Sequence, residues 1–101
     1  MRKIIISDTS CLITLDKINK LIILKHLFQV ITVTPVIARE FGQPLPNFIE
    51  IIIPSQKKFQ EILQMNIDAG EASAIALALE YKDPLIIIDD IRARKIAEEL
   101  N

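Results

Sequence analysis

The chain contains little cysteine, histidine and glycine, and each shortage excludes a class of site. Its single cysteine, Cys11, has no partner for an internal disulfide, as is typical of proteins in a reducing compartment. One cysteine and one histidine are too few for a Cys/His zinc site. Gly42 and Gly70 are the only glycines, so no glycine-rich phosphate loop can form, which excludes a Rossmann-type nucleotide site. His26 lies in a leucine-rich stretch, and we interpret it as a structural or surface residue.

The chain also lacks a long apolar run. A membrane-spanning helix needs roughly 20 apolar residues in succession, and the longest candidate, residues 21–33, is interrupted by Lys25 and Gln29. A signal peptide needs an apolar region of about 7–15 residues, whereas the basic N-terminal start is followed by only Ile4 to Ile6. We therefore expect a cytoplasmic protein without a membrane segment.

An excess of one charge is missing as well. The 12 basic and 13 acidic residues give a net charge of −1, not the strongly basic balance typical of a nucleic-acid-binding protein. This balance does not exclude such a partner, because basic residues can gather locally. The tight basic groups are Lys57 with Lys58, and Arg92 with Arg94 and Lys95. The simplest interpretation of each group is a solvated helix face.

Isoleucine is abundant instead. Of 101 residues 21 are isoleucine, and half of all residues are hydrophobic, which excludes a disordered chain. The isoleucines cluster in short runs within 4–7, 51–54 and 85–89. Runs of β-branched residues of this length are typical of strands buried on both faces of a parallel sheet. The length suits a single domain, which we place at residues 1–101.

Strand and helix patterns follow one another along the chain. Strands are predicted at 3–7, 30–33, 48–53 and 85–88. Helices are predicted at 11–28 with a break near 16–20, from Thr34-Pro35 to Gly42, from Ser55 to about Met65, at 71–80 and at 91–100. This order predicts an α/β fold of three layers (α/β/α), in which a central parallel sheet of four strands lies between helices.

Two of the predicted strands end directly in aspartate, the first at Asp8 and the fourth at Asp89 and Asp90. Ligands of open parallel sheets bind beyond the carboxyl ends of the strands, so these carboxylates converge if the two strands are neighbours. Crowded carboxylates require a proton or a cation, and oxygen ligands of this kind suit Mg²⁺ or Mn²⁺. The alternative is that each aspartate only caps the helix that follows it.

Two glutamates stand out on predicted helices. Glu40 follows an apolar stretch, and Glu71 begins an alanine-rich helix. The alternative for Glu40 is a solvent-facing side chain that pairs with Arg39. The alternative for Glu71 is a favourable interaction between an acid in the first turn and the helix dipole.

Four segments resemble the PIN-domain family, and within it the prokaryotic branch close to the VapC-type toxin nucleases. In chain order they read IIISDTS, VTPVIAREFG, DAGEASAIALALE and LIIIDDIRARKIA. Each motif is weak alone, but their order and spacing make the match fairly specific over residues 3–97. The resemblance puts the family's four acids at Asp8, Glu40, Glu71 and Asp90, with Asp89 as the polar neighbour of the last. Which of Asp89 and Asp90 is the fourth ligand stays open.

The resemblance implies a metal-dependent endoribonuclease, the toxin of a toxin–antitoxin pair, with RNA as substrate and an antitoxin protein as partner. The implied ligands of Mg²⁺ or Mn²⁺ are Asp8, Glu71, Asp89 and Asp90. The implied catalytic acids are Asp8, Glu40, Glu71 and Asp90. Such an ion makes bound water easier to deprotonate and stabilises charge on the phosphate. The candidates for substrate binding, through a hydroxyl or a guanidinium group, are Thr9, Ser10, Arg92 and Arg94.

The C-terminus departs from the family pattern. Members of this branch usually continue into a fifth strand, whereas this chain stops at Asn101. The fourth strand is then expected to be an exposed apolar edge, which favours pairing with another chain. We therefore predict a homodimer or a partner that covers the edge. The alternative function is a shortened, non-catalytic PIN-fold module that dimerises or binds RNA or protein.

Overall fold

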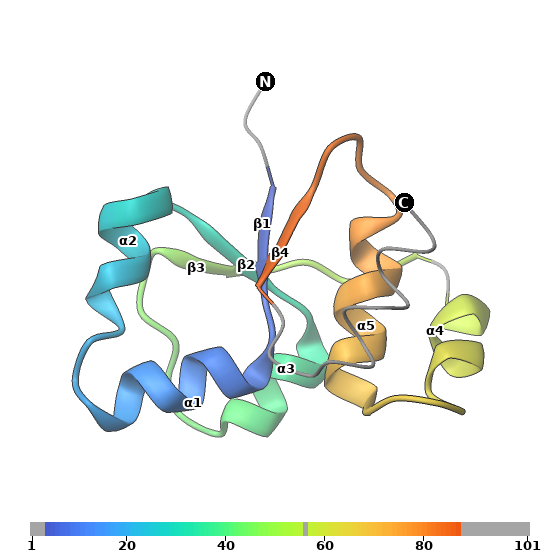
Figure 1. The fold of residues 1–101 in the computed structure, drawn as a ribbon, viewed down its shortest axis with the longest axis horizontal. Coiled ribbons are helices and arrows are strands. Elements are labelled where there is room, and N and C mark those ends of the chain that lie inside the picture. The colour runs from blue at the N-terminus through green and yellow to red at the C-terminus, as the bar shows by residue number, and fades with distance from the viewer. Residues whose placement is uncertain (1–3, 56, 88–101) are drawn as a thin grey trace.

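The computed structural model describes residues 4–55 and 57–87 (Figure 1). The strands are β1 (Ile5–Ser7), β2 (Ile31–Val33), β3 (Ile49–Ile51) and β4 (Leu85–Ile87). The helices are α1 (Thr9–Lys17), α2 (Ile22–Phe28), α3 (Pro35–Phe41), α4 (Lys57–Leu63) and α5 (Ala69–Ala78). None of these helices is long and apolar enough to span a membrane.

The strands form one parallel sheet in the order β3-β2-β1-β4. In Figure 1, α2 lies to the left of β1 and β4, whereas α5 lies to their right with α4 outside it. Helices therefore flank the sheet on both sides, which confirms the predicted α/β fold with a four-stranded parallel sheet. The predicted helix at 91–100 lies outside the described residues, as does Ile88 at the end of the predicted fourth strand.

The core is built on the two central strands. Every residue of β1 and β2 is buried, and Ile6, Ile31 and Val33 are fully inaccessible to solvent. Leu12 of α1 and Leu77 of α5 belong to the same apolar cluster. Because β1 is buried from end to end, the residue that follows it is held in a fixed position at the carboxyl edge of the sheet.

The outer strands are less buried than the two central ones. Ile51 of β3 is 51% exposed, Ile53 beyond it is 68% exposed, and Leu85 of β4 is 38% exposed. Within the described part of the chain β3 and β4 each have one strand neighbour, so less structure covers them. The exposure of Leu85 agrees with the apolar edge expected at the fourth strand. Pairing of that edge with another chain stays a prediction.

Side-chain caps begin two helices as predicted. The Asp8 carboxylate accepts a hydrogen bond from the Cys11 N–H at 2.9 Å and caps α1. The Thr34 hydroxyl accepts one from the Ile37 N–H at 3.2 Å and caps α3. Gly42 ends α3 in the left-handed conformation with φ of 69°, which glycine adopts without strain. These local signals fix where the helix that carries Glu40 begins and ends.

The start of α5 differs from the prediction in a way that matters for the site. The helix begins at Ala69, not at Glu71, because the Asp68 carboxylate accepts a hydrogen bond from the Gly70 N–H at 2.9 Å and caps it. Glu71 consequently lies inside the first turn. Helix α1 likewise begins two residues earlier than predicted, and α4 begins two residues later.

Candidate acidic site at the carboxyl edge of the sheet

Asp8 lies where the two central strands end. It follows β1 directly and is 1% exposed. Its backbone N–H donates to the carbonyl of Ile87, the last residue of β4, at 3.0 Å. Figure 1 shows β1 running down into α1 at this point, with α3 and the first turn of α5 close by. Asp8 therefore caps α1, as the simpler alternative held, and also lies at the edge where parallel sheets bind ligands.

Glu40 reaches from α3 to the start of α1 and α5. Its Oε1 accepts a hydrogen bond from the Thr9 hydroxyl at 2.5 Å. A Cβ atom built on Gly70 would collide with the same Oε1 and lie 3.1 Å from Thr9 Oγ1. The residue as a whole is exposed, but its carboxylate packs against two other elements. Within the described ranges it makes no ion pair with Arg39, so of the alternative the exposed position is seen and the pairing is not.

Glu71 is a buried acid with an unsatisfied oxygen. The residue is 7% exposed, and its Oε2 has no hydrogen-bond partner. Burial is the largest cause that raises the pKa of Glu71. The next causes are a side-chain hydrogen bond with Asp68 and the negative charge of Asp68, and the negative charge of Asp8 adds a smaller increase. Together they raise the pKa of Glu71 from an ordinary 4.5 to about 7. Asp8, Asp68 and Glu71 are therefore close enough for their charges to interact.

A buried pair of hydroxyls joins the helix of Glu40 to the helix of Glu71. Thr34 Oγ1 and Ser73 Oγ lie 2.5 Å apart, and both residues are fully buried. The Ser73 hydroxyl donates to the carbonyl of Gly70 at 2.8 Å, so its single proton is used there and Thr34 is the donor to Ser73. This chain of hydrogen bonds fixes the first turn of α5 against the first turn of α3.

A family model described as PIN domain matches residues 4–101. The chain belongs to the PIN-domain family. No curated protein and no solved structure matches it. The match confirms the family expected from the four motifs, while membership of the VapC-type branch stays a prediction. In this PIN domain Glu71 lies near enough to Asp8 for their charges to interact, while Glu40 contacts Thr9 beside Asp8.

Sequence reasoning missed one acid of the PIN domain's edge, Asp68. The helix that carries Glu71 was expected to begin at residue 71, but Asp68 caps α5 from Ala69 and raises the pKa of Glu71. The string Asp68-Ala-Gly-Glu71 carried a usable signal, because an aspartate followed three residues later by glutamate is typical of a helix N-terminus. Asp68 is exposed, so it can contact solvent or a ligand.

The remaining predicted site residues of the PIN domain fall into two groups, those that the structure describes and those that it does not. Thr9 contacts Glu40, whereas Ser10 in the same turn of α1 shows no hydrogen bond to an acid within the described ranges. The candidates that lie outside the described residues are Asp89, Asp90, Arg92 and Arg94. Nothing in the described geometry bears on those four, and their roles stay predictions.

The donors at the edge fit a hard cation, but the described ones do not complete a site. All are carboxylate oxygens, which suit Mg²⁺ or Mn²⁺, and the unsatisfied Oε2 of Glu71 lies among charges that a cation would neutralise. Between residues 4 and 87, apart from Gln56, no three histidine, cysteine, aspartate or glutamate side chains come together closely enough to hold one ion. The described acids by themselves do not form a cation site.

Proposed function

We propose that this PIN domain is a metal-dependent endoribonuclease that hydrolyses phosphodiester bonds in RNA. The observation that carries the proposal is Glu71, a buried acid with an unsatisfied oxygen and with Asp8 and Asp68 beside it. Burying an acid without a partner destabilises the fold, because the carboxyl group loses its hydration. Buried acids with raised pKa values cluster at functional sites. A divalent cation satisfies the oxygen and neutralises the neighbouring charges.

The proposed ligands of Mg²⁺ or Mn²⁺ are Asp8 and Glu71, together with Asp89 or Asp90. When bound, the ion activates a water and stabilises negative charge on the attacked phosphate. The Glu71 carboxyl has to lose its proton before it can act as a ligand, because the cation and the proton compete for the same oxygen. The Thr9 hydroxyl holds the Glu40 carboxylate at the edge of the site through its hydrogen bond.

The proposal also includes the substrate and partners of the protein. RNA phosphate is proposed to contact Arg92 and Arg94, and the Ser10 hydroxyl is proposed to orient a water near the acids. We further propose that the protein is the toxin of a toxin–antitoxin pair and forms a homodimer, with the exposed Leu85 of β4 in support. A chain that sediments as a monomer at all concentrations would contradict the homodimer.

A non-catalytic PIN-fold module is the second candidate. It is favoured by the finding that the acids in the described ranges include no three that are positioned for one ion. Such a module would bind RNA or protein without cleaving it. The two candidates differ in whether the acids are needed for turnover, and a single substitution separates them.

Asp8→Asn is the decisive substitution, because asparagine caps a helix as well as aspartate does. The variant is expected to keep the cap of α1 and the stability of the fold, while Mn²⁺-dependent cleavage of single-stranded RNA falls by about a hundredfold or more. The measurement compares cleavage with Mn²⁺ and with EDTA. Asp16→Asn, an exposed acid on the same helix, is the matched control and is expected to cleave like the wild type.

Two results would change the conclusion. If the wild type shows no Mn²⁺-dependent cleavage of any single-stranded RNA, the non-catalytic module is the better description. If the wild type cleaves and Asp8→Asn cleaves equally well, Asp8 is only a helix cap.

A further inference from the structure

A second feature of the molecule is a pocket between α3 and α4. It has a volume of about 370 Å³, which lies in the range of small-ligand sites. Its walls come from one face of α3, one face of α4 and the segment that follows β3. Arg39 lines the pocket and belongs to α3, the helix that also carries Glu40, so the pocket and the acids share this helix.

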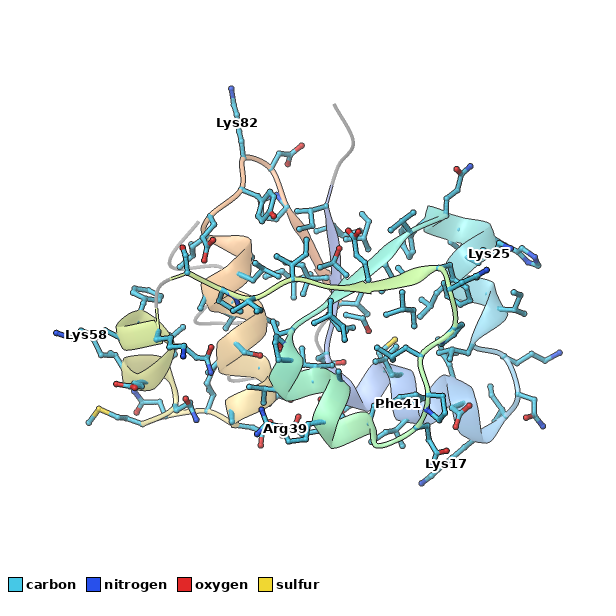
Figure 2. The ribbon with its side chains drawn as sticks, turned by 180° about the vertical axis from the view of Figure 1, so that it is seen from behind. Lys17, Lys25, Arg39, Phe41, Lys58 and Lys82 are labelled. Carbon is cyan, nitrogen blue, oxygen red and sulfur yellow. The ribbon has the colours of Figure 1, made fainter. Side chains whose placement is uncertain are left out.

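Two exposed cations flank the pocket. Arg39 comes from α3 and Lys57 from the start of α4, and neither makes a hydrogen bond or ion pair within the described part of the chain. Figure 2 labels Arg39 on α3, whereas Lys58 points away from the body of the protein at the outer end of α4. Glu61 also lines the pocket and offsets one of the two positive charges. The pocket nevertheless provides two cationic groups that can attract phosphate, whereas the acids repel it.

The other walls suit a nucleobase. Gln60 of α4 and Gln64, in the turn that follows the helix, both line the pocket, and each amide can both donate and accept hydrogen bonds. Pro35 and Ile53 supply apolar surface against which the face of a base can pack. Single-stranded nucleic acids are bound in this way, with basic groups along the backbone and flat or apolar surface for the bases.

We propose that the pocket between α3 and α4 binds one nucleotide of a single-stranded RNA, next to the phosphate presented to the acids. Arg39 and Lys57 contact the RNA phosphates, and Gln60 and Gln64 contact the base. This inference rests on the proposed function, since it names a binding site for the same substrate. The two adjacent lysines then differ in role, because Lys57 lines the pocket whereas Lys58 points into solvent.

The test measures binding rather than cleavage. A short fluorescein-labelled single-stranded RNA is titrated with the protein in EDTA, which prevents metal-dependent cleavage, and anisotropy is recorded over a range of salt concentrations. Arg39→Gln and Lys57→Gln are each expected to weaken binding by about three- to tenfold and to lower the salt slope, because each removes about one phosphate contact. Lys58→Gln removes the same charge one residue away and is expected to bind like the wild type.

A second measurement tests contact with the base. Gln64→Ala is expected to reduce the difference in affinity between RNAs of different base composition and to leave the salt slope unchanged, because an amide contacts no counterion-bearing phosphate. The Gln64 side chain is exposed, so circular dichroism should show that the Gln64→Ala variant is folded. A Gln64→Ala variant with unchanged base preference would remove the base contact from the proposal.

Three results would overturn the pocket. Equal weakening by Lys57→Gln and Lys58→Gln would mean that binding follows net charge and not this site. Unchanged binding in Arg39→Gln and Lys57→Gln would place the RNA elsewhere. If the wild type does not bind RNA, the pocket is not an RNA site, and a protein becomes the better candidate for its ligand. Cleavage by the wild type and its loss in Asp8→Asn are measured separately, so failure of the pocket and failure of the nuclease proposal are distinguishable.

Discussion

The acidic site and the pocket share helix α3, yet their charges lie in opposite environments. Glu71 and Asp8 are buried, so their charges act on one another through a medium of low polarity, and the pKa of Glu71 rises to about 7. Arg39 and Lys57 are exposed, and water screens their charges. Burial therefore makes the acids depend on a proton or a cation, while the cations of the pocket remain available to a polyanion.

Because of this contrast, removing a charge should change the stability of the protein differently in the two regions. Removing a charge from the acidic site should relieve repulsion and so stabilise the metal-free fold, at the expense of activity. Removing a charge from the pocket should leave stability almost unchanged, because surface charges contribute little to it. The comparison is tested by measuring stability and activity together in the same variants.

The largest effect is expected from Glu71→Gln. The amide cannot ionise, so the variant loses a proposed cation ligand, and Mn²⁺-dependent RNA cleavage should fall by about a hundredfold or more. In EDTA at neutral pH the same variant should be more stable to urea than the wild type, since one of the clustered negative charges is gone and the amide can donate to Asp68. Both quantities are measured on the same preparations.

Glu61→Gln is the matched control in the pocket. This exposed glutamate is expected to change neither cleavage nor stability by more than a small amount, because water screens its charge. A Glu71→Gln variant that still cleaves RNA with Mn²⁺, or that loses stability in EDTA, would contradict the contrast between the two regions.

The second effect concerns the pH dependence of stability. An acid whose pKa is raised on folding binds its proton more tightly in the native state than in the unfolded state. The contribution of Glu71 is thus fully present below its unfolded pKa of about 4.5 and is lost as pH rises to about 7. The unfolding free energy therefore declines across this range, because the unfolded state releases the proton at lower pH than the native state does.

Urea unfolding in EDTA across this pH range measures the effect. Among the described residues, Asp8 and Asp68 are the acids that raise the pKa of Glu71, and Glu71→Gln should flatten the decline in unfolding free energy between these pH values. Saturating Mn²⁺ should also reduce the decline, because cation binding favours the carboxylate over the acid. An equally steep decline in Glu71→Gln would assign the pH dependence to other groups.

The parts of the fold that the sequence predicted depend on local physics. The caps at Asp8 and Thr34 join residues three apart, and Gly42 ends its helix through its own backbone conformation. Such signals are contained in a short stretch of sequence. The parallel arrangement of the sheet followed from the alternation of strands and helices.

The parts that sequence reasoning missed depend on residues far apart in the chain. Thr34 and Ser73 are separated by 39 positions, and nothing near either residue indicates the other. The exposure of Ile51 follows from the place of β3 at one end of the described sheet, which a run of isoleucines does not specify. Asp68 is the exception, because its relation to Glu71 was local and readable.

The smallest effects are expected from the two glycines, which should respond in opposite ways. In Gly70→Ala the new Cβ meets the Glu40 carboxylate and the Thr9 hydroxyl. The flexible Glu40 side chain can move aside, and alanine favours the helix by up to about 1 kcal/mol, so stability should change little. Because Glu40 is then displaced from Thr9, RNA cleavage should fall by about tenfold.

Gly42→Ala should behave in the reverse manner. Its φ of 69° strains any other residue by roughly 1–2 kcal/mol, so stability should fall, while cleavage per folded molecule should stay at the wild-type level. Urea unfolding and Mn²⁺-dependent cleavage of both variants form the test. If Gly70→Ala loses stability but not activity, then the close contact serves only the packing of α5, and Glu40 has no part in the reaction.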